Sequence, residues 1–256
     1  MVLSYDLPKI ICMAKYENME RLVIFDADGT SIDAFRAVEL TFQRLGMDIG
    51  DIDRFQKRRK LFKFLGGLRE FPTNLRRQFG KHSRKRLLMT LTEVYRHEAC
   101  LYPGMASLLR VLLADPGIRV GVITRNVTIE PEETLKCLFE RHGIDIAEFD
   151  FFSCIPLKEN KTAYLQRARQ SFAINPARAY ACGDEYGDYL AAIGAGMHPL
   201  VVSYGFEDNL RLTNKFGVPG EIISTSPDEF IGNLLNALGM TTEALTPKPI
   251  AAREPL

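Results

Sequence analysis

The sequence predicts an α/β fold, in which a mainly parallel β-sheet is covered by helices and a separate helical domain is inserted after the first strand. Short β-like runs alternate with amphipathic helical patterns over much of the 256 residues. A long helical block separates the first two of these runs. Such a block is too large for one connection between strands, so we expect it to form a small domain of its own.

The strands are expected at six short apolar runs: Arg21–Phe25, Arg119–Ile123, Phe149–Cys154, Ala179–Cys182, Leu200–Ser203 and Glu221–Ile223. Helices are expected between them, and their ends carry recognisable signals. Pro131 begins one helix and Gly143 ends it, and Ser226 with Glu229 forms a capping box at the start of another. The alternation of strands and helices favours a parallel sheet.

The inserted block begins with a helix whose apolar residues lie at helical spacing from Phe35 to Leu45, with Asp33 as a possible N-cap. A similar pattern extends from Leu87 to Tyr95. The last helical pattern of the chain ends at Gly239, and the rest lacks periodicity. We therefore predict a core domain of residues 1–30 and 103–239, a helical domain of residues 31–102 and a disordered tail of residues 240–256.

Composition excludes several classes of protein. With 46% hydrophobic and 25% charged residues, the chain is neither a disordered protein nor a disulfide framework. The longest uncharged apolar stretch, Tyr189–Met197, is far too short to span a bilayer. The first twenty residues lack the order of a secretory signal, and the five cysteines are widely spaced without a Cys-x-x-Cys pair. We therefore expect a cytoplasmic protein with reduced cysteines.

One segment carries an unusual concentration of positive charge. Arg54–Arg86 contains thirteen Lys or Arg and one acid, Glu70, in a chain whose net charge is +1. The segment is therefore +12 and the rest of the chain is −11. This asymmetry indicates that the segment lies near anions, although a solvated helix face is the other interpretation of such a charge run.

The strongest local signal for function is an apolar strand that leads into Asp26, Asp28, Gly29 and Thr30. Residues two apart on an extended chain point to the same side, so both carboxylates are expected to face a crevice at the carboxyl end of the strand. One carboxylate could attack phosphorus while the other, protonated, supplies a proton to the leaving group. A simple turn is the alternative, but the position directly after a strand favours function.

In these residues the chain resembles the haloacid dehalogenase superfamily, over roughly Arg21–Gly239. The resemblance implies a Rossmann-like core with an inserted α-helical cap domain, and phosphoryl transfer through an aspartyl-phosphate. Asp26 would be the nucleophile and Asp28 the general acid and base. Members that displace halide lack an acid at the position of Asp28, so the resemblance implies a phosphatase.

The same resemblance implies two phosphate-binding motifs further along the chain. Thr124, at the end of the second predicted strand, would hold phosphate oxygens, and Arg125 beside it is a second candidate for binding substrate. A lysine at the start of a later helix would pair with Asp26 and with the phosphoryl group. The surrounding register favours Lys161 for this role over Lys158.

The last motif places three acids, Asp184, Glu185 and Asp188, after an apolar strand. Acids so close together need a cation or water, and a hard divalent ion such as Mg²⁺ suits them. The resemblance implies that Asp184 binds Mg²⁺ together with Asp26, that Asp188 or Glu185 acts through water, and that Asp28 joins through its backbone carbonyl. An acid-rich helix N-terminus is the other interpretation of this run.

The motifs predict a Mg²⁺-dependent phosphatase that hydrolyses a small phosphorylated metabolite, as a monomer or homodimer without a membrane partner. The helical insertion is similar to that of phosphoglycolate phosphatases and phosphohexomutases, so a mutase is a second hypothesis. A third is a binding protein that retains the fold and holds nucleic acid or another polyanion through its basic segment. The intact acids favour an enzyme, because a binding protein has no need of them.

Ser31, Glu185 and Gly187 depart from the residues usual in the family.

Overall fold

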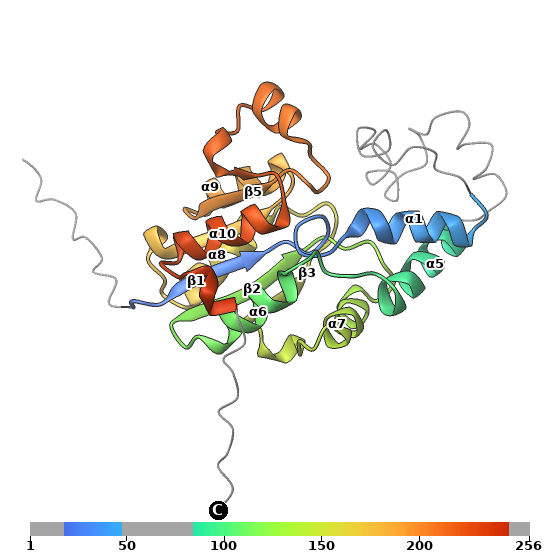
Figure 1. Cartoon of the computed structure of the whole chain (residues 1–256), viewed down its shortest axis with the longest axis horizontal. Helices are drawn as coiled ribbons and strands as arrows, with labels where there is room; N and C mark the ends of the chain where they lie inside the picture. The colour runs from blue at the N-terminus through green and yellow to red at the C-terminus, as the bar shows by residue number, and fades with distance from the viewer. Residues whose placement is uncertain (1–17, 48–83, 246–256) are drawn as a thin grey trace, which may run out of the picture.

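A computed structural model describes residues 18–47 and 84–245 and contains a six-stranded parallel sheet between two layers of helices (Figure 1). The strands are β1 (Arg21–Phe25), β2 (Ile118–Thr124), β3 (Phe151–Cys154), β4 (Ala179–Gly183), β5 (His198–Val202) and β6 (Ile223–Ser224). The α-helices are α1 (Ala34–Arg44), α5 (Arg84–His97), α6 (Met105–Ala114), α7 (Pro131–Arg141), α8 (Lys161–Ser171), α9 (Tyr186–Gly194) and α10 (Pro227–Ala237).

The predicted fold class is confirmed, with small differences in strand ends. The strand β1 has the predicted bounds, whereas β5 begins two residues earlier than expected, at His198. Three expected helix starts are also present. The side chains of Asp33 and Ser226 each accept a hydrogen bond from a backbone N–H in the first turn of α1 and α10, and α7 begins at Pro131. No helix within the described ranges is long and apolar enough to cross a bilayer.

The sheet has the strand order β3-β2-β1-β4-β5-β6, and all its neighbouring strands are parallel. The chain therefore builds one half of the sheet outward from β1 and the other half outward from β4. At such a reversal the connections leave in opposite directions and open a crevice at the carboxyl ends of the two central strands. Because Phe25 of β1 lies opposite Cys182 of β4, the residues that follow both strands meet at this crevice.

The two faces of the sheet are covered by different helices, as expected for parallel strands that are buried on both sides. Along β1 the side chains alternate: Val23 and Phe25 pack into one apolar cluster, Leu22 and Ile24 into the other. The first cluster includes residues of α6, α7 and α10, and the second includes residues of α8 and α9. Burial on both faces holds β1 rigidly and so positions the residues directly after it.

The inserted helices α1 and α5 pack against each other and extend from one end of the sheet (Figure 1). The helix α5 also packs against α7, which follows β2. Apolar residues of both inserted helices, such as Phe35 and Leu91, join the same cluster as Val23 of the sheet. Apart from Arg84, Lys85 and Arg86 at the start of α5, the basic segment lies outside the described residues, and the proposed division into core and cap remains a prediction.

The chain continues on the core beyond Gly239, where the sequence predicted the start of a disordered tail. Residues Thr242–Leu245 form a short 3-10 helix, and Met240 and Leu245 pack against the main apolar cluster. Gly239 has a φ of +67°, which lets the Met240 N–H turn back to the Leu235 carbonyl at the end of α10. The segment is thus packed on the core although its sequence has no periodic pattern. Residues 246–256 lie outside the described part of the chain.

Candidate active site

The loop after β1 brings Asp26 to the end of β4. Asp26 donates its backbone N–H to the Cys182 carbonyl, at 2.9 Å. Its own carbonyl accepts a bond of 2.9 Å from the Ser31 hydroxyl. The chain turns at Gly29, whose φ is +81° and where a Cβ would lie 2.4 Å from Asp184 Oδ2. Glycine is therefore required here both for the turn and for the approach to Asp184.

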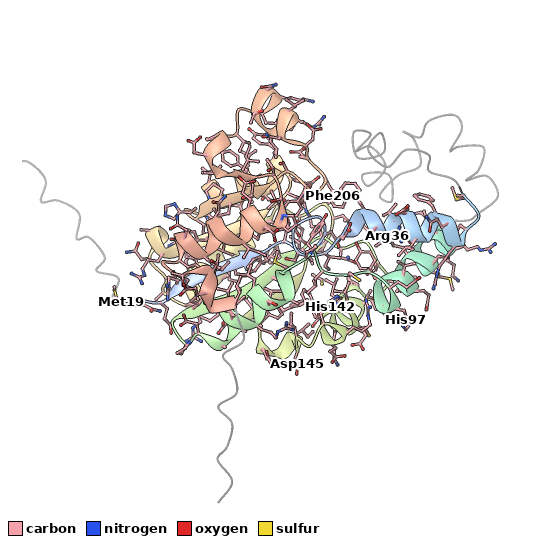
Figure 2. All side chains as sticks on the ribbon, in the orientation of Figure 1. Met19, Arg36, His97, His142, Asp145 and Phe206 are labelled. Carbon is pink, nitrogen blue, oxygen red and sulfur yellow. The ribbon has the colours of Figure 1, made fainter. Side chains whose placement is uncertain are left out.

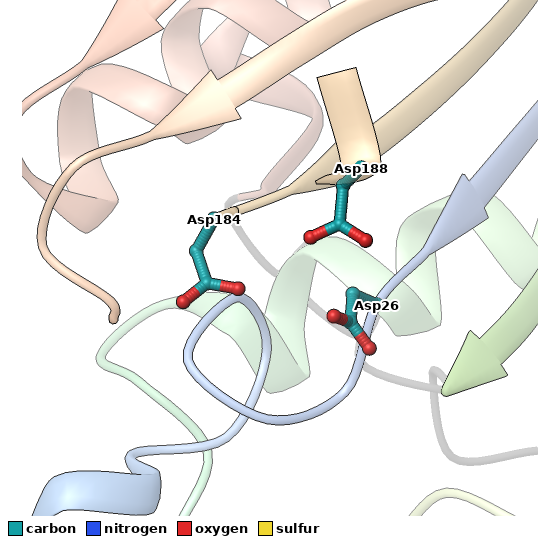
Figure 3. Close-up of side chains that lie close together, drawn as sticks. All are labelled: Asp26, Asp184 and Asp188. Atoms are coloured by element: carbon teal, nitrogen blue, oxygen red, sulfur yellow. The ribbon is translucent and has the colours of Figure 1, made fainter. Parts of the chain in front are cut away.

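Three carboxylates converge at this edge of the sheet (Figure 3). Asp26 follows β1, Asp184 follows β4, and Asp188 lies in the first turn of α9. One oxygen of each lies within 4.8 Å of the others. Asp184 is fully buried, and its Oδ2 accepts the backbone N–H of Phe206, which lies near the start of α1 (Figure 2).

The electrostatics of these three carboxylates favour a bound cation. Burial raises the pKa of Asp26 and of Asp184 above the usual value, and the negative charge of Asp188 adds to both increases. Within the described part of the chain, Asp184 Oδ1 is buried without a hydrogen-bond partner. An unpartnered carboxylate oxygen beside two further carboxylates fits a hard divalent ion such as Mg²⁺, which prefers oxygen ligands.

Lys161, the first residue of α8, supplies the positive charge nearest to Asp26. Its Nζ lies 2.6 Å from Asp26 Oδ2 and 2.7 Å from Asp188 Oδ1, and the side chain is buried. Burial alone would lower the pKa of Lys161, but Asp188 and Asp26 more than offset it and raise the pKa above its usual value. The lysine is therefore charged at neutral pH. Lys158, the alternative considered from the sequence, is exposed.

The carboxylate of Asp28 contacts partners other than those of Asp26. Its Oδ1 accepts a bond of 2.8 Å from the Tyr95 hydroxyl, and the Asn126 amide donates to Oδ1 and Oδ2 at 3.1 and 2.9 Å. Burial and the nearby charge of Asp26 raise the pKa of Asp28 to about 7. The Asp28 carboxylate does not belong to the group formed by Asp26, Asp184 and Asp188, and binding of a metal by the Asp28 backbone carbonyl stays a prediction.

The two predicted substrate-binding residues of the second motif lie at the end of β2. Thr124 Oγ1 is buried and has no hydrogen-bond partner among the described residues, as expected of a group that forms its hydrogen bonds with a bound ligand. Arg125 binds Glu185 Oε2 at 3.1 Å and lies 4.0 Å from Asp188 Oδ1. Glu185, which departs from the usual motif, therefore has Arg125 as an ionic partner.

Tyr95 and Asn126 are the site residues that sequence reasoning missed. Tyr95 belongs to the apolar pattern of α5, and its ring is buried, so the sequence indicated only a packing role. Asn126 lies two residues after Thr124 and directly after Arg125, two residues that the sequence predicts to bind substrate. A hydroxyl at the end of an otherwise apolar helical face is the one signal that could have pointed to Tyr95.

A Rossmann-like sheet with acids and a buried lysine at its central crevice defines an enzyme of the α/β class. A family model described as haloacid dehalogenase-like hydrolase matches residues 20–196. The chain belongs to this family, and the resemblance inferred from its motifs is confirmed.

Curated relatives narrow the class of hydrolase. The chain is 27% identical over 198 residues to a phosphoglycolate phosphatase of Psychrobacter arcticus, covering 73% of this chain and 85% of the relative. It is 28% identical over 145 residues to a phosphoglycolate phosphatase of Nitrosococcus oceani, covering 56% and 58% of the two chains. Family and relatives together make the protein a phosphatase-type hydrolase.

Solved structures share the fold at lower sequence identity. A hydrolase of the same family from Deinococcus radiodurans, with bound phosphate and sodium, has a TM-score of 0.61 at 15% identity and covers 91% of this chain and 100% of its own. CbbY from Rhodobacter sphaeroides, in complex with phosphate, has a TM-score of 0.51 at 24% identity, with coverages of 75% and 89%. These likenesses concern the fold alone.

Proposed function

We propose that the protein is a Mg²⁺-dependent phosphatase that hydrolyses a small phosphorylated metabolite through an aspartyl-phosphate on Asp26. The observation that carries this proposal is the buried Lys161 ammonium, 2.6 Å from Asp26. A buried cation in contact with the proposed nucleophile offsets the charge that accumulates when a phosphoryl dianion approaches a carboxylate. A purely structural ion pair would not need the two further acids beside it, nor an unpartnered buried hydroxyl at the end of β2.

In the first half of the reaction, a carboxylate oxygen of Asp26 forms a bond to phosphorus while the bond from phosphorus to the leaving oxygen breaks. The carboxyl group of Asp28 gives its proton to that leaving oxygen. In the second half, water attacks phosphorus and passes a proton to Asp28, and the bond from phosphorus to Asp26 breaks. A pKa of about 7 for Asp28 suits a group that must give and then take a proton near neutral pH.

Binding of the phosphoryl group falls to the residues around Asp26. Lys161 and the Thr124 hydroxyl offer donors to its oxygens, and Arg125 lies beside them, paired with Glu185. Asp26, Asp184 and Asp188 would hold the metal ion. When bound, Mg²⁺ supplies positive charge that relieves the repulsion between these acids and the phosphate.

The curated relatives suggest which substrates to test first. Both are named phosphoglycolate phosphatases, so phosphoglycolate is the first candidate within the class of small phosphorylated metabolites. A mutant of CbbY, with a TM-score of 0.50, is described in complex with xylulose-(1,5)bisphosphate, which places sugar bisphosphates second.

The proposal is tested by measuring phosphate release by the purified chain from phosphoglycolate, a panel of sugar phosphates and p-nitrophenyl phosphate, each with Mg²⁺ and with excess chelator. We expect turnover of at least one metabolite and of the aryl phosphate with Mg²⁺ only. The Asp26→Asn variant is the control for contaminating phosphatases. Full turnover in excess chelator would contradict the metal dependence, and turnover that survives Asp26→Asn would contradict the nucleophile.

A further inference from the structure

The proton donor of the proposed reaction is held by two side chains that the reaction scheme does not use. Both oxygens of the Asp28 carboxylate accept hydrogen bonds, from Tyr95 at 2.8 Å and from Asn126 at 3.1 and 2.9 Å. The bonds come from two elements, the helix α5 and the loop after β2. A carboxyl group that is hydrogen-bonded from two sides is held in one orientation, and proton transfer depends on that orientation.

Tyr95 is itself fixed, although it belongs to the inserted segment. Its side chain is only 3% exposed, and its backbone carbonyl accepts a bond of 3.2 Å from Arg141 Nη2 at the end of α7. The same guanidinium binds the carbonyl of Ala99, just beyond α5. The end of α5 that carries Tyr95 is thereby tied to a helix of the sheet layer. The Tyr95 hydroxyl consequently reaches Asp28 from a rigid base.

Asn126 is fixed in a similar way from the other side. Its amide oxygen accepts the backbone N–H of Thr128 at 2.9 Å, which leaves the amide nitrogen directed at Asp28. The residue is 7% exposed. Because the oxygen is occupied by an N–H donor, the amide cannot flip without losing bonds on both sides.

We propose that Tyr95, together with Asn126, is a positioning residue for the proton donor Asp28. The inserted helical segment would then do more than adjoin the site, because it would orient the group that transfers the proton. This role rests on the proposed phosphatase function. It concerns the step in which the proton of Asp28 goes to the leaving oxygen as the bond between phosphorus and that oxygen breaks. Tyr95 itself donates a hydrogen bond throughout and neither gains nor loses a proton.

The test compares two substrates that differ in their need for a proton. Phenyl phosphate releases a basic oxygen that must be protonated, whereas p-nitrophenyl phosphate releases an anion that leaves unaided. Tyr95→Phe removes the hydroxyl and keeps the ring. We expect kcat/KM to fall ~10-fold for phenyl phosphate and at most ~2-fold for p-nitrophenyl phosphate, because kcat/KM reports the step that forms the aspartyl-phosphate.

Two further variants separate positioning from a general effect on the fold. Tyr180→Phe is the matched control, since the Tyr180 hydroxyl also donates one bond of 2.8 Å, but to the Ala237 carbonyl at the end of α10. It is expected to leave both substrates unaffected. Asn126→Asp keeps the oxygen that binds Thr128 and replaces the donor to Asp28, and we expect the same selective loss on phenyl phosphate as for Tyr95→Phe, with unchanged circular dichroism.

The decisive measurement adds Tyr95→Phe to Asp28→Asn. With the proton donor already removed, loss of the hydroxyl should have no further effect on phenyl phosphate. Equal decreases on the two substrates, or a full additional loss in the double variant, would overturn the role of Tyr95 while the phosphatase function stands. If instead Asp26→Asn retains wild-type activity on both substrates, the proposed function itself fails, and the role of Tyr95 fails with it.

Discussion

At the scale of single residues, the two acids of the first motif differ in their contacts. Asp26 contacts the Lys161 ammonium, and Asp28 contacts the neutral donors Tyr95 and Asn126. The Lys161 ammonium favours the charged form of Asp26 and so opposes the effect of burial, whereas burial and the charge of Asp26 raise the pKa of Asp28 to about 7, so that Asp28 is partly protonated at neutral pH. Two acids that lie two positions apart in the sequence thus have the different surroundings that the two roles of the proposed reaction need.

This difference predicts distinct defects for the two amide variants. Asp26→Asn should abolish formation of the phosphoenzyme, because the amide cannot attack phosphorus. Asp28→Asn should still form it, with activity reduced ~10² to 10⁴-fold through loss of proton transfer. Rapid quenching with ³²P-labelled substrate measures both. Labelling of the Asp26→Asn protein would show that the nucleophile is another residue.

A second prediction concerns Asp184, which is buried beside Asp26 and Asp188. Without metal its charge opposes folding, so Asp184→Asn should melt at the same temperature as the wild type or higher. The asparagine oxygen can still accept the Phe206 N–H. Mg²⁺ should raise the melting temperature of the wild type, because it binds only the folded protein, and should leave the variant unchanged. A thermal shift that Asp184→Asn retains would place the metal elsewhere.

At the scale of elements, the start of α8 determines where Lys161 lies. The Asn160 side chain caps the helix by accepting the Thr162 N–H at 2.9 Å, and Lys161 is the next residue. The side chain of Lys161 therefore enters the crevice from the first turn of the helix. The other buried residues of this helix, Leu165 and Ala168, pack against one face of the sheet. The residue that caps the helix and the lysine proposed to bind the phosphoryl group are therefore neighbours in the sequence.

We expect Asn160→Ala to lower both stability and activity. Loss of an N-cap costs about 0.5 to 2 kcal/mol in the free energy of unfolding, and fraying of the first turn would move Lys161 away from Asp26. Ser226→Ala, which removes the N-cap of α10, is the matched control: it should cost similar stability and leave kcat/KM unchanged. Urea unfolding and steady-state kinetics on p-nitrophenyl phosphate separate the two effects. An equal loss of kcat/KM in both variants would argue against a specific effect on Lys161.

At the scale of the whole molecule, charge is divided unevenly between Arg54–Arg86, at +12, and the remaining residues, at −11. Most of the positive segment lies outside the described residues, so its role is argued from the sequence. A positive segment close to an anion-binding crevice would raise the local concentration of anionic substrates. Arginines could also bind a second carboxylate or phosphate of such a substrate with paired hydrogen bonds.

Neutralising Arg58 with Arg59, or Arg76 with Arg77, should therefore raise KM for metabolites that carry an anion besides the scissile phosphate. A small aryl phosphate, which lacks a second anion, should be turned over as before, and high salt should weaken the difference. Parallel kinetics on phosphoglycolate and p-nitrophenyl phosphate provide the comparison. Equal changes on both substrates, or tight and salt-sensitive RNA binding that metabolites do not displace, would favour a different role for the segment.

Much of the fold and part of the site followed from local patterns in the sequence. The strands were predictable because parallel strands buried on both faces are short apolar runs, as in Arg21–Phe25. Asp26, Thr124 and Asp184 each follow such a run, and the carboxyl ends of parallel strands meet at one edge of the sheet. The register of the motif favoured Lys161 over Lys158, and in the structure Lys161 is the one that contacts Asp26.

The sequence by itself thus determined the class of fold, the family and the residues that follow the central strands, because these depend on local periodicity and on motifs at the ends of apolar runs. The tertiary structure alone decided the surroundings of Asp28. Alternation along an extended chain predicted that Asp26 and Asp28 face one crevice, but it could not give the partners of Asp28, because β1 ends at Phe25 and the chain then turns at Gly29. The contact of Asp28 with Tyr95 joins residues 67 positions apart, and the packing of α5 against α1 and α7 brings them together.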